Sequence, residues 1–164
     1  VVDLPGIYSL DATTLDEKVT KDFLLKKEKE ESADLFVLVL DATNLDKSLF
    51  LAFQLKELGY PLIIALNLMD EAKKRKFDID LEKFADKLNA VVIPTSASSG
   101  AGVEDLKALL KGRMSSPVQT AIEVPANHQK QFRQPSYVSN IFKQIDSLLH
   151  EVTLSPLQPD TFSE

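Results

Sequence analysis

Two polar loops of this sequence carry side chains that suit recognition of a nucleotide base. Asn67 and Asp70 come directly after an apolar run, and Ser96 follows a second one. A carboxylate such as Asp70 can accept hydrogen bonds from N1–H and the exocyclic amino group of guanine, whereas adenine presents an acceptor and no amino group there. Asn67 would brace the loops, and the backbone N–H after Ser96 would donate to guanine O6. The predicted base-binding residues are Asn67, Leu68, Asp70, Ser96 and Ala97.

The same short pattern has a purely structural interpretation. Asn and Asp in loops often cap helices or form Asx turns, and the serine-rich stretch 95–99 could cap the helix that follows it. The position of these residues favours a ligand, because open α/β sheets bind ligands outside the carboxyl ends of their parallel strands. Several polar segments of this sequence follow predicted strands, so we predict a guanine-nucleotide site.

A further candidate site lies near the N-terminus, where apolar residues lead into Asp3-Leu4-Pro5-Gly6. Asp3 would hold a Mg²⁺-bound water, and the Gly6 N–H would meet a terminal phosphate because no Cβ obstructs the approach. The alternative is a β-turn, which Pro5 and Gly6 favour by themselves. Asp41 also follows a predicted strand, and we assign it a structural role in tethering its loop.

Together these motifs make the sequence similar to the GTPase domain of the ferrous iron transport protein B family. The resemblance covers roughly residues 1–112. It is most specific in the run Asp3-Leu4-Pro5-Gly6-Ile7-Tyr8-Ser9-Leu10 followed by Asp16-Glu17. It also rests on Asp41-Ala42-Thr43-Asn44-Leu45, on Asn67-Leu68-Met69-Asp70 and on Ser96-Ala97.

The resemblance implies a parent protein that binds Mg-GTP, hydrolyses it slowly and couples hydrolysis to Fe(II) uptake. It implies that guanine nucleotide and the membrane-spanning remainder of the transporter are the partners. The domain would lie at the cytoplasmic face of the membrane, with this fragment itself soluble.

The phosphate-binding motif of such enzymes, Gly-x-x-x-x-Gly-Lys-Ser/Thr, does not occur in this sequence. We therefore expect an N-terminally truncated domain that lacks the phosphate loop and first switch, and we exclude a circular permutation because the motif is not at the C-terminus either. Weak or no GTP binding by this chain is predicted. The catalytic residues stay undefined: Ile7 stands where Ras-like enzymes place a water-orienting Gln, and Asp16 or Glu17 suits a helix start better.

Composition excludes several function classes. The 164 residues are 44% hydrophobic and 27% charged, which suits a folded domain with a sizeable core. A net charge of −6 argues against nucleic acid as a partner, and we expect the basic stretch 73–76 to be a solvated helix face. There is no cysteine, and His128 and His150 are too far apart in sequence to suggest a metal pair. No apolar run approaches the roughly 18 residues of a membrane helix.

Apolar periodicity predicts alternating strands and helices, hence a three-layer, doubly wound, mostly parallel α/β sheet. The resemblance implies that this sheet is of the P-loop GTPase type. The predicted strands are 35–40, 62–66 and 91–93. The predicted helices are 14–31, 45–58, 71–76, 81–88, 103–110 and 137–152, with Gly59 and Gly112 as C-terminal stops.

This order divides the chain into a partial GTPase domain at 1–112, a linker or irregular segment at 113–135, a helix at 136–152 and a flexible tail at 153–164. The C-terminal helix could belong to the small helical domain that follows the GTPase domain in this family, fold back onto the core, or be unrelated sequence. Two other functions stay open: a soluble GTPase of ribosome or tRNA maturation, and a nucleotide-free interaction module on a GTPase fold.

Overall fold

The computed structural model describes residues 1–10, 15–25, 35–114 and 134–154. Three parallel strands form its sheet in the order β1 (Phe36–Asp41), β2 (Leu62–Asn67) and β3 (Val91–Pro94). The register pairs Asp41 with Asn67 and Leu66 with Pro94, so the strands end at one common edge. Central β2 is buried over residues 62–66, as a parallel strand covered on both faces requires. The parallel α/β fold is confirmed.

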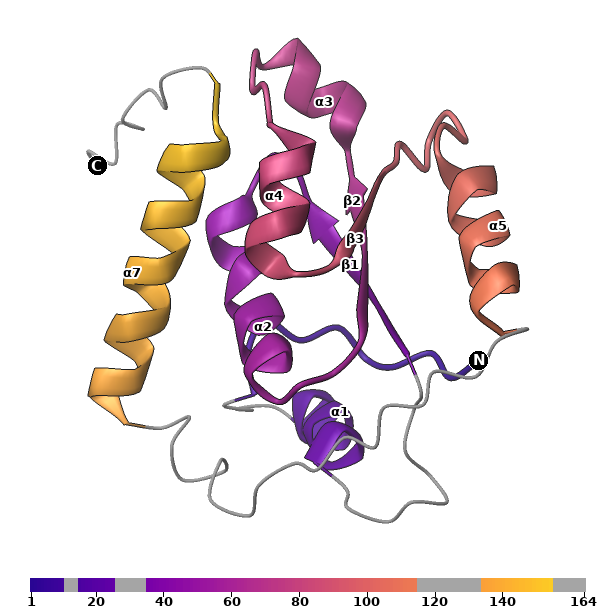
Figure 1. Ribbon diagram of the computed structural model, residues 1–164. Coiled ribbons are helices and arrows are strands. Elements are labelled where there is room, and N and C mark those ends of the chain that lie inside the picture. Colours follow the sequence, from indigo (N-terminus) through magenta and orange to yellow (C-terminus); the bar gives the residue numbers. More distant parts are fainter. Residues whose placement is uncertain (11–14, 26–34, 115–133, 155–164) are drawn as a thin grey trace.

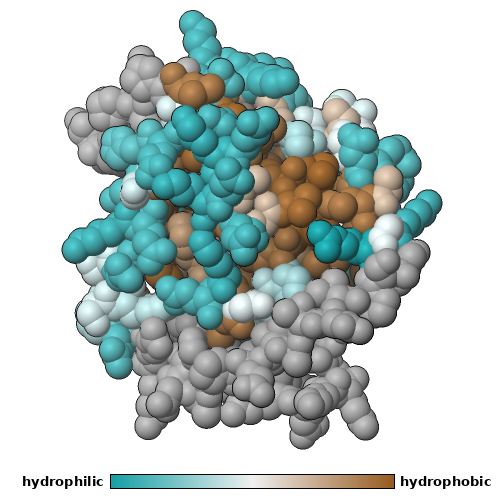
Figure 2. Space-filling view, viewed as in Figure 1, coloured by the Kyte–Doolittle hydropathy of each residue, from teal (hydrophilic) through white to brown (hydrophobic). Residues whose placement is uncertain are grey.

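Helices cover the sheet unequally. Helices α2 (Leu45–Glu57) and α4 (Leu81–Leu88) lie on one face, and α5 (Val103–Met114) lies on the other (Figure 1). On β1, Val37 and Val39 are exposed whereas Leu40 is buried. Hydrophobic side chains gather on the surface between the sheet and α5 (Figure 2). The core therefore sits mainly on the α2 side.

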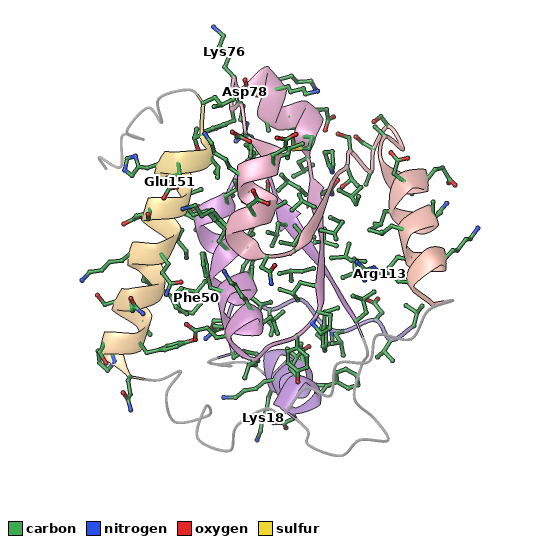
Figure 3. All side chains as sticks on the ribbon, in the orientation of Figure 1. Lys18, Phe50, Lys76, Asp78, Arg113 and Glu151 are labelled. Atoms are coloured by element: carbon green, nitrogen blue, oxygen red, sulfur yellow. The ribbon has the colours of Figure 1, made fainter. Side chains whose placement is uncertain are left out.

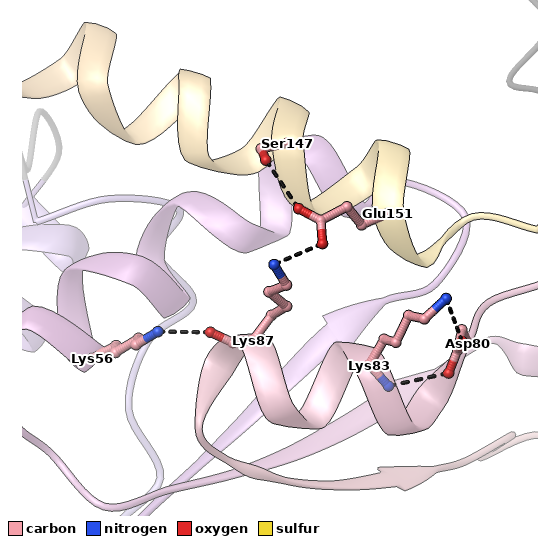
Figure 4. A network of polar contacts seen from close by, with 6 residues as sticks. All are labelled: Lys56, Asp80, Lys83, Lys87, Ser147 and Glu151. Carbon is pink, nitrogen blue, oxygen red and sulfur yellow. Dashed lines mark hydrogen bonds and ion pairs between the residues drawn. The ribbon is translucent and has the colours of Figure 1, made fainter.

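Helix α7 (Pro135–Val152) folds back onto the core. It buries a stripe spaced by helical turns against α2 and α4: Tyr137, Ile141, Ile145, Leu148 and Val152. Polar contacts at the rim support this packing, with Lys87 Nζ 2.6 Å from a Glu151 carboxylate oxygen and Ser147 Oγ donating to Glu151 at 3.2 Å (Figure 4). The predicted arrangement in which this helix folds back onto the core is present in the structure. None of the described helices is both long and apolar enough to cross a membrane.

The short helices differ slightly from the prediction. Helix α1 runs over Leu15–Leu25, and the predicted continuation to residue 31 lies outside the described residues. Helix α3 (Met69–Lys74) begins two residues earlier than predicted. Most of the predicted linker and tail also fall outside the described residues.

The two glycines predicted to stop helices behave differently. Gly59 has φ +79°, and Tyr60 N–H donates to the Leu55 carbonyl at 3.2 Å, which is the expected glycine cap of α2. The prediction for Gly112 was wrong, because α5 continues through it to Met114. Lys111 and Arg113 in the last turn favour continuation, since their charges complement the helix dipole.

Candidate functional site

The site begins where β2 turns into α3. Asn67 is the last residue of β2, and Leu68 has the left-handed conformation, with φ 63°, that turns the chain into α3. The Met69 N–H donates to the Thr95 carbonyl at 3.2 Å. This backbone bond joins the loop after β2 to the loop after β3. The two predicted base-binding loops are therefore neighbours in space.

Asn67 braces the second loop. Its Oδ1 accepts a hydrogen bond from the Ala97 N–H at 3.1 Å and lies 3.4 Å from the Thr95 hydroxyl. This is the bracing role predicted for Asn67. It also engages the Ala97 N–H, which is the group we predicted would donate to guanine O6.

Ser96 holds Asp70 in place. The Asp70 N–H donates to Ser96 Oγ at 3.1 Å, and the Ser96 residue is 5% exposed. A hydrogen bond from Ser96 to the carboxylate is the main cause that lowers the pKa of Asp70, with backbone N–H groups and Lys74 adding to it. Asp70 is therefore an anion at neutral pH, which is the form that accepts from two guanine donors.

One carboxylate oxygen of Asp70 is left without a partner. Asp70 Oδ1 is shielded from solvent and accepts no hydrogen bond in the described part of the chain. The residue as a whole is only half-buried, so its carboxylate lies at the margin of the surface. A shielded acceptor of this kind costs free energy unless a donor reaches it. Asp70 Oδ1 can therefore accept a hydrogen bond from a ligand.

Two residues that the sequence did not single out shape the second loop. The Thr95 side chain is buried beside Asn67, and Gly102 has φ +73°. A Cβ on Gly102 would lie 2.0 Å from the Pro94 carbonyl oxygen, so only glycine fits there. The serine- and glycine-rich run 95–102 was the available signal, but the close backbone approach is a long-range contact that no local pattern encodes.

The N-terminal candidates are separate from these loops. Asp3 and Gly6 are exposed, and Val1 and Val2 form no strand pairing with the described strands. The segment is tied by the Thr20 hydroxyl, which donates to the Pro5 carbonyl at 2.8 Å. In Figure 1 the N-terminus lies toward the amino ends of the strands, away from α3. The structure therefore does not bring Asp3 or Gly6 together with the base-binding loops.

Asp41 and Ile7 are two further positions that the sequence singled out. Asp41 accepts from both the N–H and the hydroxyl of Thr43 at 2.7 Å, which confirms its role as a loop tether. Ile7 packs against the hydrophobic core and has no polar group with which to orient water. No group of three or more His, Asp or Glu residues in the described ranges is arranged to hold a metal ion.

Comparison with known proteins decides the family. The family model described as ferrous iron transport protein B matches residues 1–110. The chain belongs to the ferrous iron transport protein B family. The Fe(2+) transporter FeoB of Salmonella typhimurium is 41% identical over 111 residues, which cover 65% of this chain and 14% of that protein. The Helicobacter pylori FeoB is 46% identical over 99 residues, covering 60% and 15%.

Solved structures agree with this family assignment. The FeoB G-domain from Methanococcus jannaschii is 42% identical, with a TM-score of 0.61 over 67% of this chain and 68% of that one. The cytosolic domain of L. pneumophila FeoB matches 93% of this chain and 78% of that one, at 26% identity and a TM-score of 0.69. The T. maritima FeoB cytosolic domain in its GMPPNP form has a TM-score of 0.73 at 23% identity, over 93% and 79% of the two chains, and shows the fold alone.

Proposed function

We propose that this chain is part of the guanine-nucleotide-binding regulatory domain of a ferrous iron transporter. In the whole protein, this domain would lie at the cytoplasmic face of the membrane and would couple GTP hydrolysis to Fe(II) uptake. The observation that carries the proposal is the shielded, unpartnered Oδ1 of Asp70 at the carboxyl edge of the sheet. Family membership and the similarity to the Fe(2+) transporter FeoB of Salmonella typhimurium support the proposed role in iron transport.

Guanine fits the chemistry of Asp70. The ionised carboxylate accepts from N1–H and from the exocyclic amino group, and the hydrogen bond from Ser96 keeps it ionised. Adenine offers an acceptor at N1, which would face the carboxylate acceptor without a proton between them. The site should therefore discriminate against adenine by leaving buried polar groups unpaired.

The Ala97 N–H would donate a hydrogen bond to guanine O6. In the structure this donor bonds to Asn67 Oδ1 at 3.1 Å, so O6 would share it or displace the Asn67 oxygen. The backbone of Asn67 is fixed as well, because its main-chain carbonyl accepts a hydrogen bond from the Ala42 N–H at 2.9 Å. Asn67 thus holds the second loop within reach of a base, and Leu68 sets the turn between the two polar residues.

The phosphate end of the site belongs to the same proposal. Asp3 would contact Mg²⁺ through a water, and the Gly6 N–H would meet the terminal phosphate. A Cβ on Gly6 would meet nothing within 4 Å, so the segment is open to a ligand. Bound Mg²⁺ would neutralise phosphate charge. The membrane-spanning remainder of the transporter would be the partner to which this segment signals.

A second function is favoured by one observation. The sequence has no Gly-x-x-x-x-Gly-Lys-Ser/Thr motif, so this chain taken alone could be a nucleotide-free interaction module on a GTPase fold. The family match argues against the other alternative, a soluble GTPase of ribosome or tRNA maturation.

The experiment that tests the base site is a ligand swap. The chain is titrated with GDP and with xanthosine diphosphate, before and after Asp70→Asn, and binding is followed by calorimetry and by the amide NMR signal of Ala97. Asp70→Asn should weaken GDP roughly 10- to 100-fold, the range for hydrogen bonds to a charged group, and improve the xanthine ligand.

Asp78→Asn is the matched control, since Asp78 is an exposed aspartate in the turn after α3. It should leave both ligands unaffected. If neither GDP nor xanthosine diphosphate binds, the result would favour a nucleotide-free interaction module for this chain. An equal loss of both ligands with Asp70→Asn would contradict guanine-edge recognition.

A further inference from the structure

Four consecutive basic residues, two in the last turn of α3 and two directly after it, form one exposed surface. Lys73, Lys74, Arg75 and Lys76 are all exposed, and Lys76 projects from the tip of the molecule (Figure 3). Lys74 is paired with Glu71, with 2.6 Å between Nζ and Oε1. The ion pairs among the described residues do not involve Lys73, Arg75 or Lys76. This basic turn, residues 73–76, therefore carries three positive charges that form no ion pair with the described residues.

The backbone of the basic turn is strained at Lys76. Lys76 has φ 61°, and the bonds around it close a helix end: Lys76 N–H donates to the Lys73 carbonyl at 3.0 Å and Phe77 N–H to the Ala72 carbonyl at 2.9 Å. Glycine is the usual residue at this position because it has no Cβ to crowd the left-handed conformation. The turn keeps a lysine where glycine would be less strained.

Helix α2 shows what the unstrained version looks like. There, Gly59 N–H donates to the Lys56 carbonyl at 2.9 Å and Tyr60 N–H to the Leu55 carbonyl at 3.2 Å, so Gly59 occupies the place that Lys76 occupies after α3. The same chain thus caps one helix with glycine and the other with a charged residue. Residues in this conformation recur at functional sites, and Lys76 shares it with Leu68 and Asn89 among the described non-glycine residues.

An exposed apolar side chain lies next to the basic turn. Leu154 N–H donates to the Asp78 carbonyl at 2.9 Å, and Ile79 forms a β-bridge with Thr153. Leu154 is 60% exposed. Basic residues with an exposed leucine beside them are the composition of surfaces that bind anionic membranes, where charge attracts and the apolar group inserts at the headgroup boundary.

We propose that the basic turn and Leu154 form a docking surface for anionic phospholipid headgroups. The choice of a membrane rests on the proposed function, since the parent would be a membrane transporter. The net charge of −6 does not oppose local docking, because charges farther than about 8–10 Å are largely screened at physiological salt. The acidic residues nearest in sequence to the basic turn are Asp70 and Glu71 before it and Asp78 and Asp80 after it. Glu71 is paired with Lys74 and Asp80 with Lys83, and these carboxylates limit the attraction.

The test measures binding of the full chain to vesicles by sedimentation, without nucleotide. Vesicles of phosphatidylcholine alone are compared with an equimolar mixture of phosphatidylcholine and phosphatidylglycerol. We expect binding to the anionic vesicles alone, with weakening as salt rises. Lys76→Gly and Lys76→Gln should each weaken binding about fivefold, the factor that corresponds to one basic residue near an anionic surface.

Two variants separate a docking role from a structural one. Lys76→Gly should unfold at the same or a higher temperature than the parent chain, because it relieves the backbone strain while removing the charge. Lys18→Gln makes the same charge change on α1, at the opposite end of the molecule in Figure 3, and should leave vesicle binding unchanged.

Several outcomes would overturn the proposal. One is equal binding to neutral and anionic vesicles. Another is an equal loss of vesicle binding with Lys18→Gln and Lys76→Gln. A third is binding of soluble polyglutamate in place of vesicles, which would identify a surface for acidic peptides. Failure here leaves the base site untouched, since vesicle binding and the GDP titration report on different residues.

Discussion

The loops after β2 and β3 differ from the N-terminal segment in how they are fixed. Backbone and side-chain bonds join the two base-binding loops, through Asn67 to Ala97, Asp70 to Ser96 and Met69 to Thr95. The segment that carries Asp3 and Gly6 is held by the hydroxyl of Thr20 and, farther on, by the Leu10 N–H bonded to the buried Gln54 side chain at 2.7 Å. The two loops predicted to bind a base are thus fixed to each other in the structure, whereas the residues predicted to meet the phosphates, Asp3 and Gly6, are not joined to them.

The largest expected effect comes from Gly102→Ala. The added Cβ would lie 2.0 Å from the Pro94 carbonyl oxygen in a left-handed backbone, so the loop must move. We expect the free energy of unfolding in urea to fall by about 3 kcal/mol, and exchange of the Ala97 amide to speed up. This would convert the fixed loops into a mobile pair.

Two other glycine-to-alanine changes serve as controls. Gly59 has a similar φ of +79° but meets nothing within 4 Å, so Gly59→Ala should cost about 1 kcal/mol. Gly112 lies inside α5, where an added Cβ would meet nothing within 4 Å, so Gly112→Ala should raise the free energy of unfolding by about 1 kcal/mol. If Gly102→Ala were no worse than Gly59→Ala, the close approach to Pro94 would not exist in solution.

Much of the base site was predictable because it follows strands. The apolar run 62–66 is continuous, and a buried parallel strand must end where polar residues such as Asn67 begin. The roles of Thr95 and Gly102 were not predictable, because each depends on a neighbour brought close by the fold. The prediction for Gly112 was wrong although glycine is common just after helices, because the basic residues of the last turn complement the helix dipole and α5 continues to Met114.

Ser96→Ala tests, through the pH dependence of stability, whether Ser96 fixes the Asp70 carboxylate. The pKa of Asp70 lies below its ordinary value of 3.8 chiefly because of the hydrogen bond from Ser96. A lowered carboxyl pKa stabilises the fold above the ordinary value, and this stability is lost as pH falls through the lower folded value. The parent chain should therefore lose more stability on acidification below about pH 5 than Ser96→Ala does.

The same variant has an expected effect at neutral pH. Ser96→Ala removes the acceptor for the Asp70 N–H, so the free energy of unfolding should fall by about 1 kcal/mol near pH 7. Urea titrations of both proteins across the acid range measure the two effects together. Ser98→Ala is the control, because Ser98 lies in the same loop and is exposed. Parallel pH curves for the parent and Ser96→Ala would show that Ser96 does not hold the carboxylate.

The smallest effect is expected in the N-terminal segment that carries Asp3 and Gly6. Asp3 is exposed, so Asp3→Asn should change neither the unfolding free energy measurably nor the affinity of this chain for GDP without Mg²⁺. Thr20→Val, which removes the bond to the Pro5 carbonyl but keeps the shape of a buried side chain, should cost about 1 kcal/mol. A loss of GDP affinity with Asp3→Asn would mean that the N-terminal segment reaches the nucleotide. The division between two loops fixed to each other and an N-terminal segment not joined to them would then fail, because the ligand itself would be organising the segment.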